Sequence, residues 1–294
     1  MQRPGKRISK MHDKKTMMTG KISDNRSVAP GHFLMRLRLP SSFATPAPGQ
    51  FVMIRAAAQG EPLLARPLSV FDFHRYPDHC VLELLYRVAG RGTALFSGMR
   101  PGDEATVLGP LGRGFTLPAG IRRTLLVAGG VGVAPLHFLI RSGLPTVRGQ
   151  SPGAATFYLG AKSRDLLTGV EGLGGRCDLR ICTDDGSRGH CGPVTDLLKR
   201  DIDDCDPKET VVFACGPAPM IRVLEPLLKD TLIPCQVSLE ERMACGIGAC
   251  LGCAIAVGGP GRKTEYRKVC EDGPVFDLRD ILPVAPFDSR EGCI

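Results

Sequence analysis

The sequence predicts a multidomain protein that joins an all-β part to an α/β part. Three observations along the 294 residues predict this fold class. Short apolar runs separated by Gly and Pro fill the first third, apolar runs alternate with helical patterns in the middle, and Cys and Gly are frequent after Pro234. In this order they indicate an antiparallel Greek-key barrel, a Rossmann-like domain with a parallel sheet, and a small C-terminal domain.

The positive charge of the chain is concentrated at its N-terminus. Of the formal net charge of +8, residues 1–21 carry +6, from seven Lys and Arg residues and one Asp. The remainder is close to neutral, so the globular part offers no basic surface for nucleic acid. We expect residues 1–20 to form a disordered arm. No apolar run has the roughly 18 residues of a membrane span and no signal-peptide core is present, so we expect a cytoplasmic protein.

Residues 21–118 form the predicted barrel domain. Their apolar runs are short and evenly spaced, and Gly or Pro residues punctuate the connections. This pattern is typical of antiparallel strands that close into a barrel. The predicted strands cover residues 32–39, 50–55, 80–88 and 104–108.

Residues 119–233 form the predicted α/β domain. Strands that alternate with helices imply a parallel sheet, with a ligand at the carboxyl ends of its strands. The predicted strands cover residues 123–128, 155–159, 177–182 and 210–214. One predicted helix follows Gly129-Gly130 and ends at Ile140, and two others cover 194–200 and 218–229.

The last domain, residues 234–294, contains the most specific motif of the chain. Cys245-Gly-Ile-Gly-Ala-Cys250-Leu-Gly-Cys253 is followed after sixteen residues by Cys270. The C-x4-C-x2-C…C spacing is that of plant-type [2Fe–2S] centres, in which four thiolates hold two irons. Glycines in the motif allow the backbone to approach the inorganic sulfides and to donate N–H groups to them. We therefore predict a cluster with these four ligands.

Structural zinc is the alternative for a set of four cysteines. Zinc sites usually draw their ligands from two CxxC knuckles, whereas here one knuckle is joined by two single cysteines. The other eight cysteines show no ligand spacing and are interpreted as unligated core residues. They are Cys80, Cys177, Cys182, Cys191, Cys205, Cys215, Cys235 and Cys293, with Cys215 as a possible exception.

Two glycine-containing turns follow buried strands of the α/β domain. The first is Gly129-Gly130-Val-Gly132-Val-Ala-Pro135, whose backbone N–H groups and helix dipole suit a pyrophosphate. It does not have the G-x-G-x-x-G spacing, so it is a modest signal that could also be simple turn chemistry. The second, Cys215-Gly216-Pro217, sets a thiol at the carboxyl edge of the same sheet. Two such ends on one sheet predict a cleft.

The barrel domain carries groups that suit a flavin ring edge and a pyrophosphate. Arg66-Pro67-Leu68-Ser69 is expected to follow a strand, Leu85-Tyr86-Arg87 to lie on a later strand, and Gly92-Thr93 to lie at a turn that leads into a helix. Arginine and serine can bind phosphate oxygens, and a tyrosine can stack on an aromatic cofactor. An Arg-Pro turn alone is usually just a turn, so the prediction of a flavin site rests on the order of the motifs along the chain.

The order of these motifs resembles the ferredoxin–NADP reductase superfamily. Within it, the run from Ser238 through Cys253, SLEERMACGIGACLGC, looks like that of the electron-transfer subunits of class 1B dihydroorotate dehydrogenases. The likeness covers nearly the whole chain from about residue 21. Thr183-Asp-Asp-Gly-Ser187 also matches the family, whereas His190-Cys191 and Pro193 depart from it.

The resemblance implies three cofactors and the residues that bind them. FAD would contact Arg66, Pro67, Leu68, Ser69, Leu85, Tyr86, Arg87, Gly92 and Thr93. NAD would lie near Gly129, Gly130, Gly132, Pro135, Asp185, Cys215, Gly216 and Pro217, with Cys215 as the candidate catalytic residue beside the nicotinamide. Cys245, Cys250, Cys253 and Cys270 would ligate the cluster.

The resemblance also implies a function and a partner. Nicotinamide moves two electrons as hydride, a [2Fe–2S] centre moves one, and a flavin does both, so FAD must sit between the other two. The family's catalytic subunit carries FMN and oxidises dihydroorotate in pyrimidine synthesis, and this chain would relay those electrons to NAD+ in a complex of two copies of each subunit. The alternatives are a flavin subunit of a soluble hydrogenase or of an NADH-dependent ferredoxin oxidoreductase, and a non-catalytic zinc or nucleic-acid module.

The choice of NAD over NADP also comes from the resemblance. A 2′-phosphate would attract basic groups after the second strand of the α/β domain, and Lys162 and Arg164 lie there. One exposed basic pair on a loop is commonly a solvated surface.

Overall fold

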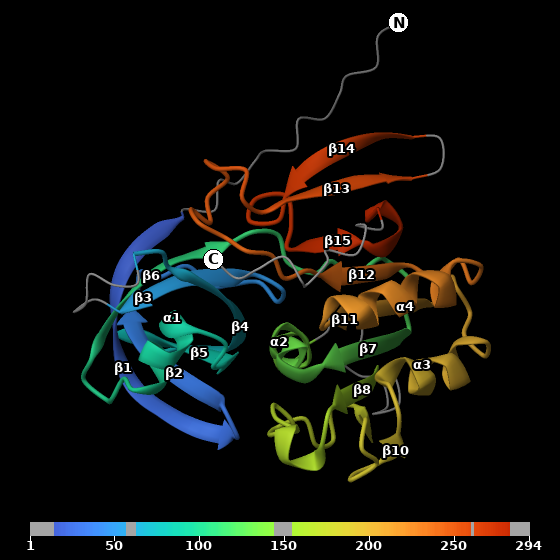
Figure 1. The fold of residues 1–294 in the computed structure, drawn as a ribbon, viewed down its shortest axis with the longest axis horizontal. Helices are drawn as coiled ribbons and strands as arrows, with labels where there is room; N and C mark the ends of the chain where they lie inside the picture. Colours follow the sequence, from blue (N-terminus) through green and yellow to red (C-terminus); the bar gives the residue numbers. More distant parts are fainter. Residues whose placement is uncertain (1–14, 57–62, 144–154, 260–261, 283–294) are drawn as a thin grey trace, which may run out of the picture.

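A computed structural model describes residues 15–56, 63–143, 155–259 and 262–282. The chain folds into a barrel, an α/β domain beside it, and a C-terminal segment that lies over both (Figure 1). This arrangement confirms the predicted fold class. None of the helices in the described ranges combines the length and apolarity needed to cross a membrane.

The barrel is closed, with the strand order β1-β2-β5-β4-β3-β6 and antiparallel pairing throughout. Alternate side chains point inward, as the two-residue period of a strand requires, and Met35, Leu37 and Ile54 are fully buried. The helix α1 (Arg91–Ser97) follows β5. The strands are β1 (Thr16–Ala29), β2 (His32–Pro40), β3 (Phe51–Ala56), β4 (Arg66–Arg75), β5 (His79–Arg87) and β6 (Glu104–Leu111).

Two barrel strands differ from the prediction. β1 begins at Thr16, so residues 16–20 of the predicted disordered arm pair with β6. The part of this arm that lies outside the described ranges is residues 1–14. Gly20 is buried against Leu39 of β2, and a Cβ at this position would lie 2.7 Å from Leu39 Cδ2. Polar residues between the inward positions hid this alternation in the sequence. The residues from Arg66 to Ser69 follow β3, as predicted, and begin a further strand, β4, that was not predicted.

The α/β domain has a seven-stranded sheet of order β10-β9-β8-β7-β11-β12-β15. Its strands are parallel except for β15, which pairs antiparallel with β12. The largely apolar β7 and β11 lie at its centre, as expected for strands covered on both faces. The strands are β7 (Arg123–Gly129), β8 (Ala155–Ala161), β9 (Asp178–Thr183), β10 (His190–Cys191), β11 (Thr210–Cys215), β12 (Cys235–Ser238) and β15 (Val275–Asp277).

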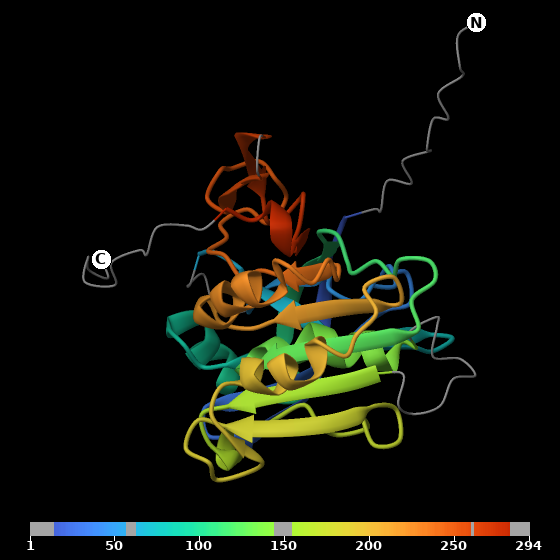
Figure 2. The same cartoon turned by 90° about the vertical axis from the view of Figure 1, so that its right-hand side faces the viewer.

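Helices cover the two faces of this sheet. α2 (Val133–Arg141) packs between the sheet and the barrel, where Val133 and Leu136 share a core with Phe71 of β4. α3 (Val194–Ile202) and α4 (Ala218–Leu228) cover the other face, in front of the strands in Figure 2. The barrel and the α/β domain therefore meet through α2.

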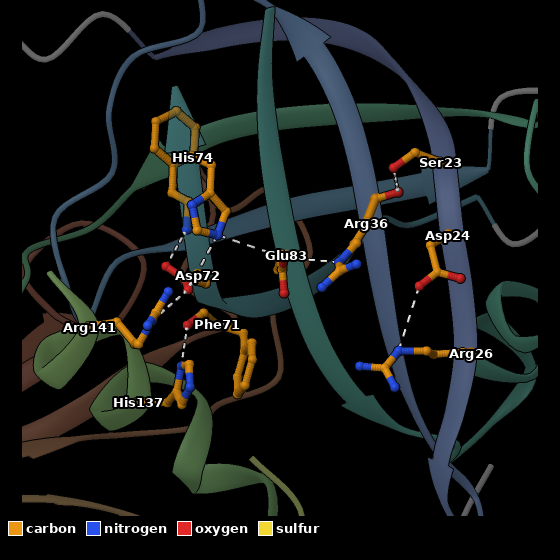
Figure 3. A network of polar contacts seen from close by, with 11 residues as sticks. Ser23, Asp24, Arg26, Arg36, Phe71, Asp72, His74, Glu83, His137 and Arg141 are labelled. Atoms are coloured by element: carbon orange, nitrogen blue, oxygen red, sulfur yellow. Dashed lines mark hydrogen bonds and ion pairs between the residues drawn. The ribbon is translucent and has the colours of Figure 1, made fainter. Parts of the chain in front are cut away.

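A polar network fixes the end of α2 on the barrel (Figure 3). Arg141 Nε lies 3.2 Å from Asp72 Oδ2, and His74 Nε2 lies 3.4 Å from the same oxygen. Glu83 pairs with Arg36 at 2.9 Å. The carboxylates of Asp72 and Glu83 are almost fully buried, and these partners compensate their charges.

The C-terminal segment is joined to the α/β sheet. β12 follows Pro234 yet lies in the sheet, so the sheet extends past the predicted domain boundary at residue 233. β15 then adds to the edge of β12. Between them, β13 (Ala254–Gly259) and β14 (Arg262–Lys268) form a hairpin that the sequence analysis did not predict.

Candidate functional site

A cavity of about 450 Å³ lies where the barrel, the α/β domain and the C-terminal segment meet. The barrel contributes six of the predicted residues: Pro67, Leu68, Ser69, Leu85, Tyr86 and Arg87. The α/β domain contributes Val131 and Ala134, from the turn before α2 and from α2 itself. A concave, largely apolar site with a few polar groups is typical of cofactor pockets of this size.

The ring of Tyr86 lies in the barrel core, whereas the sequence analysis expected a tyrosine that stacks on a cofactor. Tyr86 lines the cavity, but its side chain is 2% exposed and its hydroxyl donates to Asn25 Oδ1 at 3.1 Å. Its ring is stacked on Phe33 and meets Phe96 edge-on. The ring is thus held in the barrel core and is not free to stack on a ligand.

The third wall of the cavity is the segment from Leu239 to Met243, to which the sequence analysis gave no role. Its Glu240 lines the cavity, and desolvation raises the pKa of its carboxyl, an effect that Arg87 opposes. The run Ser238-Leu-Glu-Glu-Arg-Met, which precedes the cysteine motif and is part of the family resemblance, could have indicated this wall. Only the fold brings this run against the barrel.

Arg66 meets Gly92 beside the cavity, at the start of α1. A Cβ on Gly92 would lie 2.7 Å from Arg66 Nε. Thr93 Oγ1 accepts the N–H groups of Ala89 and Gly90, at 2.8 and 3.2 Å, and so holds the turn that leads into α1. The structure therefore brings Arg66, Gly92 and Thr93 together, next to Arg87 at the end of β5.

The two glycine-containing turns of the α/β domain are in direct contact. β7 and β11 are neighbours, with Cys215 opposite Ala128. A Cβ on Gly132 would lie 2.2 Å from the carbonyl oxygen of Cys215, and one on Gly129 would lie 2.8 Å from Pro217 Cδ. Gly130 has φ +55°, and Pro135 is buried in the first turn of α2. The absence of side chains thus lets two backbone turns close on each other at the sheet edge.

Cys215 ends β11 behind the cavity wall. It is 1% exposed, and burial raises the pKa of its thiol, as does the nearby Glu240, whereas a hydrogen bond with Ser238 lowers it. The thiol is therefore neutral and closed off from solvent in this structure.

Asp185 lies apart from the cavity, in the loop between β9 and β10. Its carboxylate accepts the N–H and the hydroxyl of Ser187, at 2.9 and 2.6 Å, and these bonds lower its pKa. The loop is at the carboxyl edge of the sheet, two strands away from β7.

The four motif cysteines lie together in two pairs. The thiols of Cys245 and Cys250 interact with each other, as do those of Cys253 and Cys270. Within the described ranges, no three His, Cys, Asp or Glu side chains converge as ligands of a single ion. A two-iron cluster needs two protein ligands on each iron, so this pairing fits a [2Fe–2S] centre better than one zinc ion.

The loop around Cys245 supplies N–H donors to its sulfur. Desolvation raises the pKa of Cys245, but backbone N–H groups of Cys250, Ile247 and Ala249 lower it to about 6. Donors of this kind stabilise a metal-bound thiolate. Gly246, at φ +70°, carries the loop against the barrel, where a Cβ would lie 2.5 Å from Met53 Cγ.

The cysteines and the cavity are separated by one layer of side chains. Phe51 lines the cavity and shares a core with Cys253 and Cys270, and Met243 lines the cavity and packs on that core. The cavity thus lies between the four cysteines and the glycine turns. Of the other cysteines, Cys80, Cys182 and Cys235 are buried as predicted, and so is Cys215, the possible exception. Cys177 and Cys205 are half-buried, Cys191 is exposed, and Cys293 lies outside the described residues.

Comparisons with known proteins agree with this geometry. A family model described as the iron–sulfur cluster binding domain of dihydroorotate dehydrogenase B matches residues 240–282, which contain all four motif cysteines. The chain is 40% identical over 256 residues to the electron transfer subunit of dihydroorotate dehydrogenase B (NAD(+)) of Desulforamulus reducens, covering 87% of this chain and 94% of that protein. The same subunit of Bacillus caldolyticus is 42% identical, with 80% and 86% covered.

Solved structures share the fold. An NADH-dependent reduced ferredoxin–NADP oxidoreductase superposes with a TM-score of 0.74 at 28% identity, covering 89% of both chains. A ferredoxin NADP+ reductase from Neisseria gonorrhoeae with bound FAD and NADP superposes with a TM-score of 0.60 at 21% identity, covering 73% of this chain and 91% of that one. The second likeness concerns the fold alone.

Proposed function

Because this chain belongs to the family of electron-transfer subunits of dihydroorotate dehydrogenase B (NAD(+)), we propose that it relays electrons between a dihydroorotate-oxidising catalytic subunit and NAD+. The observation that carries the proposal is the position of the cavity, between the glycine turns and the paired cysteines. This order suits a chain of three redox groups, with a flavin in the middle.

FAD is proposed to bind across the cavity and the start of α1. The residues from Pro67 to Ser69 and from Leu85 to Arg87 would surround its ring system, and Arg66, with Gly92 and Thr93, would hold its pyrophosphate. When bound, FAD exchanges two electrons with a nicotinamide and single electrons with an iron–sulfur cluster. Apolar side chains of the cavity would pack on the ring, and the guanidinium groups of Arg66 and Arg87 would compensate negative charge.

The cysteine pairs and the glycine turns are proposed to bind the other two cofactors. Cys245 with Cys250, and Cys253 with Cys270, would each hold one iron. The turns at Gly129, Gly130, Gly132 and Pro135, and at Gly216 and Pro217, would receive NAD, with Asp185 at the same sheet edge. Cys215 would act beside the nicotinamide as a neutral thiol, because its burial disfavours the thiolate.

The domain roles follow from these sites. We assign FAD binding to residues 21–118 together with the strand from Thr16, NAD binding to 119–233 together with β12, and cluster binding to the segment after it. The catalytic partner is proposed to carry FMN and to assemble with this chain as two copies of each, in the cytoplasm.

The Arg66–Gly92 contact gives a first prediction. Gly92→Ala should lower the affinity for FAD by about 10- to 100-fold, because the new methyl displaces the guanidinium from a charge-assisted contact of about 1.5–3 kcal/mol. Flavin fluorescence titration of the apoprotein measures the change. Gly90→Ala is the matched control, because Gly90 has extended backbone and a Cβ there would meet no described atom within 4 Å. Equal affinities in the two variants would contradict the proposed position of the pyrophosphate.

Co-expression with a dihydroorotate dehydrogenase B catalytic subunit tests the proposed function. We expect the two chains to purify together and to reduce NAD+ with dihydroorotate, whereas the catalytic subunit alone should not. The likeness to the NADH-dependent ferredoxin–NADP oxidoreductase favours one second candidate, a reductase of ferredoxin. Separate elution of the two chains, together with NADH-dependent ferredoxin reduction by this chain, would favour that candidate instead.

A further inference from the structure

Lys268, the last residue of β14, connects the two parts of the cysteine site. Its Nζ donates to the carbonyl oxygen of Gly248 at 2.9 Å and lies 2.5 Å from Glu271 Oε2. Gly248 lies in the loop between Cys245 and Cys250, whereas Lys268 lies two residues before Cys270. The side chain therefore bridges the loop of the first two cysteines and the strand of the fourth.

The backbone of Lys268 is fixed on the other side of this bridge. Its N–H donates to Asp272 Oδ2 at 2.9 Å, and its carbonyl accepts the N–H groups of Glu271 and Asp272, at 3.1 and 2.8 Å. In the hairpin it is paired with Ala254, directly after Cys253, and Val269 N donates to the carbonyl oxygen of Cys253 at 3.0 Å. The ammonium group thus extends from a rigid turn that positions Cys253 and Cys270.

Gly248 receives this contact in a conformation that favours glycine. Its φ is +84°, and a Cβ would lie 2.3 Å from Glu271 Oε2 and 3.2 Å from Lys268 Nζ. Desolvation raises the pKa of the Cys270 thiol, and the backbone N–H of Gly248 opposes this effect. The Gly248 loop therefore interacts with both Lys268 and Cys270.

We propose that Lys268 is a positioning residue of the iron–sulfur site, which holds the Gly248 loop against Cys270 and whose positive charge raises the reduction potential of the bound cluster. The proposal rests on the proposed function, because it requires a cluster on these four cysteines. Reduction adds a negative charge to a cluster, so a nearby cation favours the reduced form, and protein charges and hydrogen bonds are known determinants of cluster potentials. Glu271 opposes this effect, since its carboxylate pairs with the same ammonium group.

The opposite charges of the pair predict shifts of opposite sign. Lys268→Met should lower the reduction potential of the cluster, because it removes the cation and leaves Glu271 beside the Gly248 loop. Glu271→Gln should raise it. Lys268→Arg keeps the charge and should stay near the wild-type value. The double variant Lys268→Met/Glu271→Gln should recover much of the potential while its cluster is still lost faster than that of the wild type, because the bridge to Gly248 is missing.

The experiment is an anaerobic redox titration of the full chain followed by electron paramagnetic resonance, with iron and sulfide content measured over time in air. Lys263→Met is the matched control, since this lysine of β14 lies five residues, or about 16 Å of strand, from Lys268. Shifts of opposite sign in Lys268→Met and Glu271→Gln, with no shift in Lys263→Met, are the expected result. Wild-type potential and cluster lifetime in Lys268→Met would overturn the proposal.

Two further outcomes are also decisive. If Lys268→Met retains flavin but holds no cluster, the holding role is supported. If it loses flavin as well and does not fold, Glu271→Gln carries the test, and an unchanged potential in that variant overturns the charge effect. Failure of the proposed function is distinct from both, because this chain would then elute separately from the catalytic subunit, and absence of iron and sulfide from the wild-type protein would instead contradict the cluster itself.

Discussion

Cys250→Ala is expected to abolish cluster binding while FAD stays bound. Cys250 pairs with Cys245, so its loss leaves one iron with a single protein ligand. Loss of residues that merely support metal ligands typically costs 10- to 100-fold in affinity or activity, and loss of a ligand should cost at least about 100-fold in electron transfer to the catalytic subunit. Iron and sulfide analysis, with visible spectra, measures the loss of the cluster.

The same variant separates the flavin from the cluster. Because the groups proposed to bind FAD lie on the barrel and in the cavity, the variant should still oxidise NADH with an artificial acceptor that takes electrons from flavin. Cys205→Ala is the control, since this cysteine is half-buried like Cys250 and its thiol donates to the carbonyl oxygen of Asp201, outside the cysteine motif. Wild-type iron and sulfide content in Cys250→Ala would rule out these four cysteines as the ligand set.

Gly132→Ala is expected to destabilise the protein and to weaken NADH binding. The new Cβ would lie 2.2 Å from the carbonyl oxygen of Cys215 and 2.5 Å from its carbon, and these backbone atoms of a central strand cannot move aside as a flexible side chain can. Overpacking of this kind costs about 1–3 kcal/mol or more, which corresponds to a fall in Tm of roughly 5–10 °C. Separation of the two turns should also raise the KM for NADH.

Gly174→Ala provides the control for this substitution. Gly174 lies in a turn of the same domain at ordinary φ, and a Cβ there would meet no atom of the described residues within 4 Å. Its Tm and its KM for NADH should remain close to those of the wild type. A Gly132→Ala variant with unchanged Tm and KM would show that the contact between the turns is not needed at this spacing.

The fold was largely predictable because most elements have a strong local pattern. Apolar runs identified β2, β5 and β7, and helical patterns between the strands identified α3 and α4. The elements without such a pattern depend on distant partners. Thr16–Ala29 is too polar to be recognised as a strand without the barrel, and β12 and β15 are short strands that gain their stability from each other and from β11.

The candidate site was predictable to a similar degree, for the same reason. The spacing of four cysteines predicted a group that the structure brings together in two pairs, and local motifs predicted two walls of the cavity. The third wall, from Leu239 to Met243, is far from the barrel in sequence, and only the fold brings the two together. Tyr86 is a residue type that can stack on a cofactor, and it lies on a strand beside the cavity. Its ring nevertheless points into the barrel core, and the local sequence does not indicate this direction.

An anaerobic titration of the purified chain with NADH tests the central claim most directly, that this one chain passes electrons from a nicotinamide through a flavin to an iron–sulfur cluster. We predict that the flavin absorbance bleaches and that the electron paramagnetic resonance signal of a reduced [2Fe–2S] cluster appears, with one FAD and two irons per chain. A protein whose flavin is reduced by NADH while its cluster stays oxidised, or one that contains neither cofactor, would contradict the account.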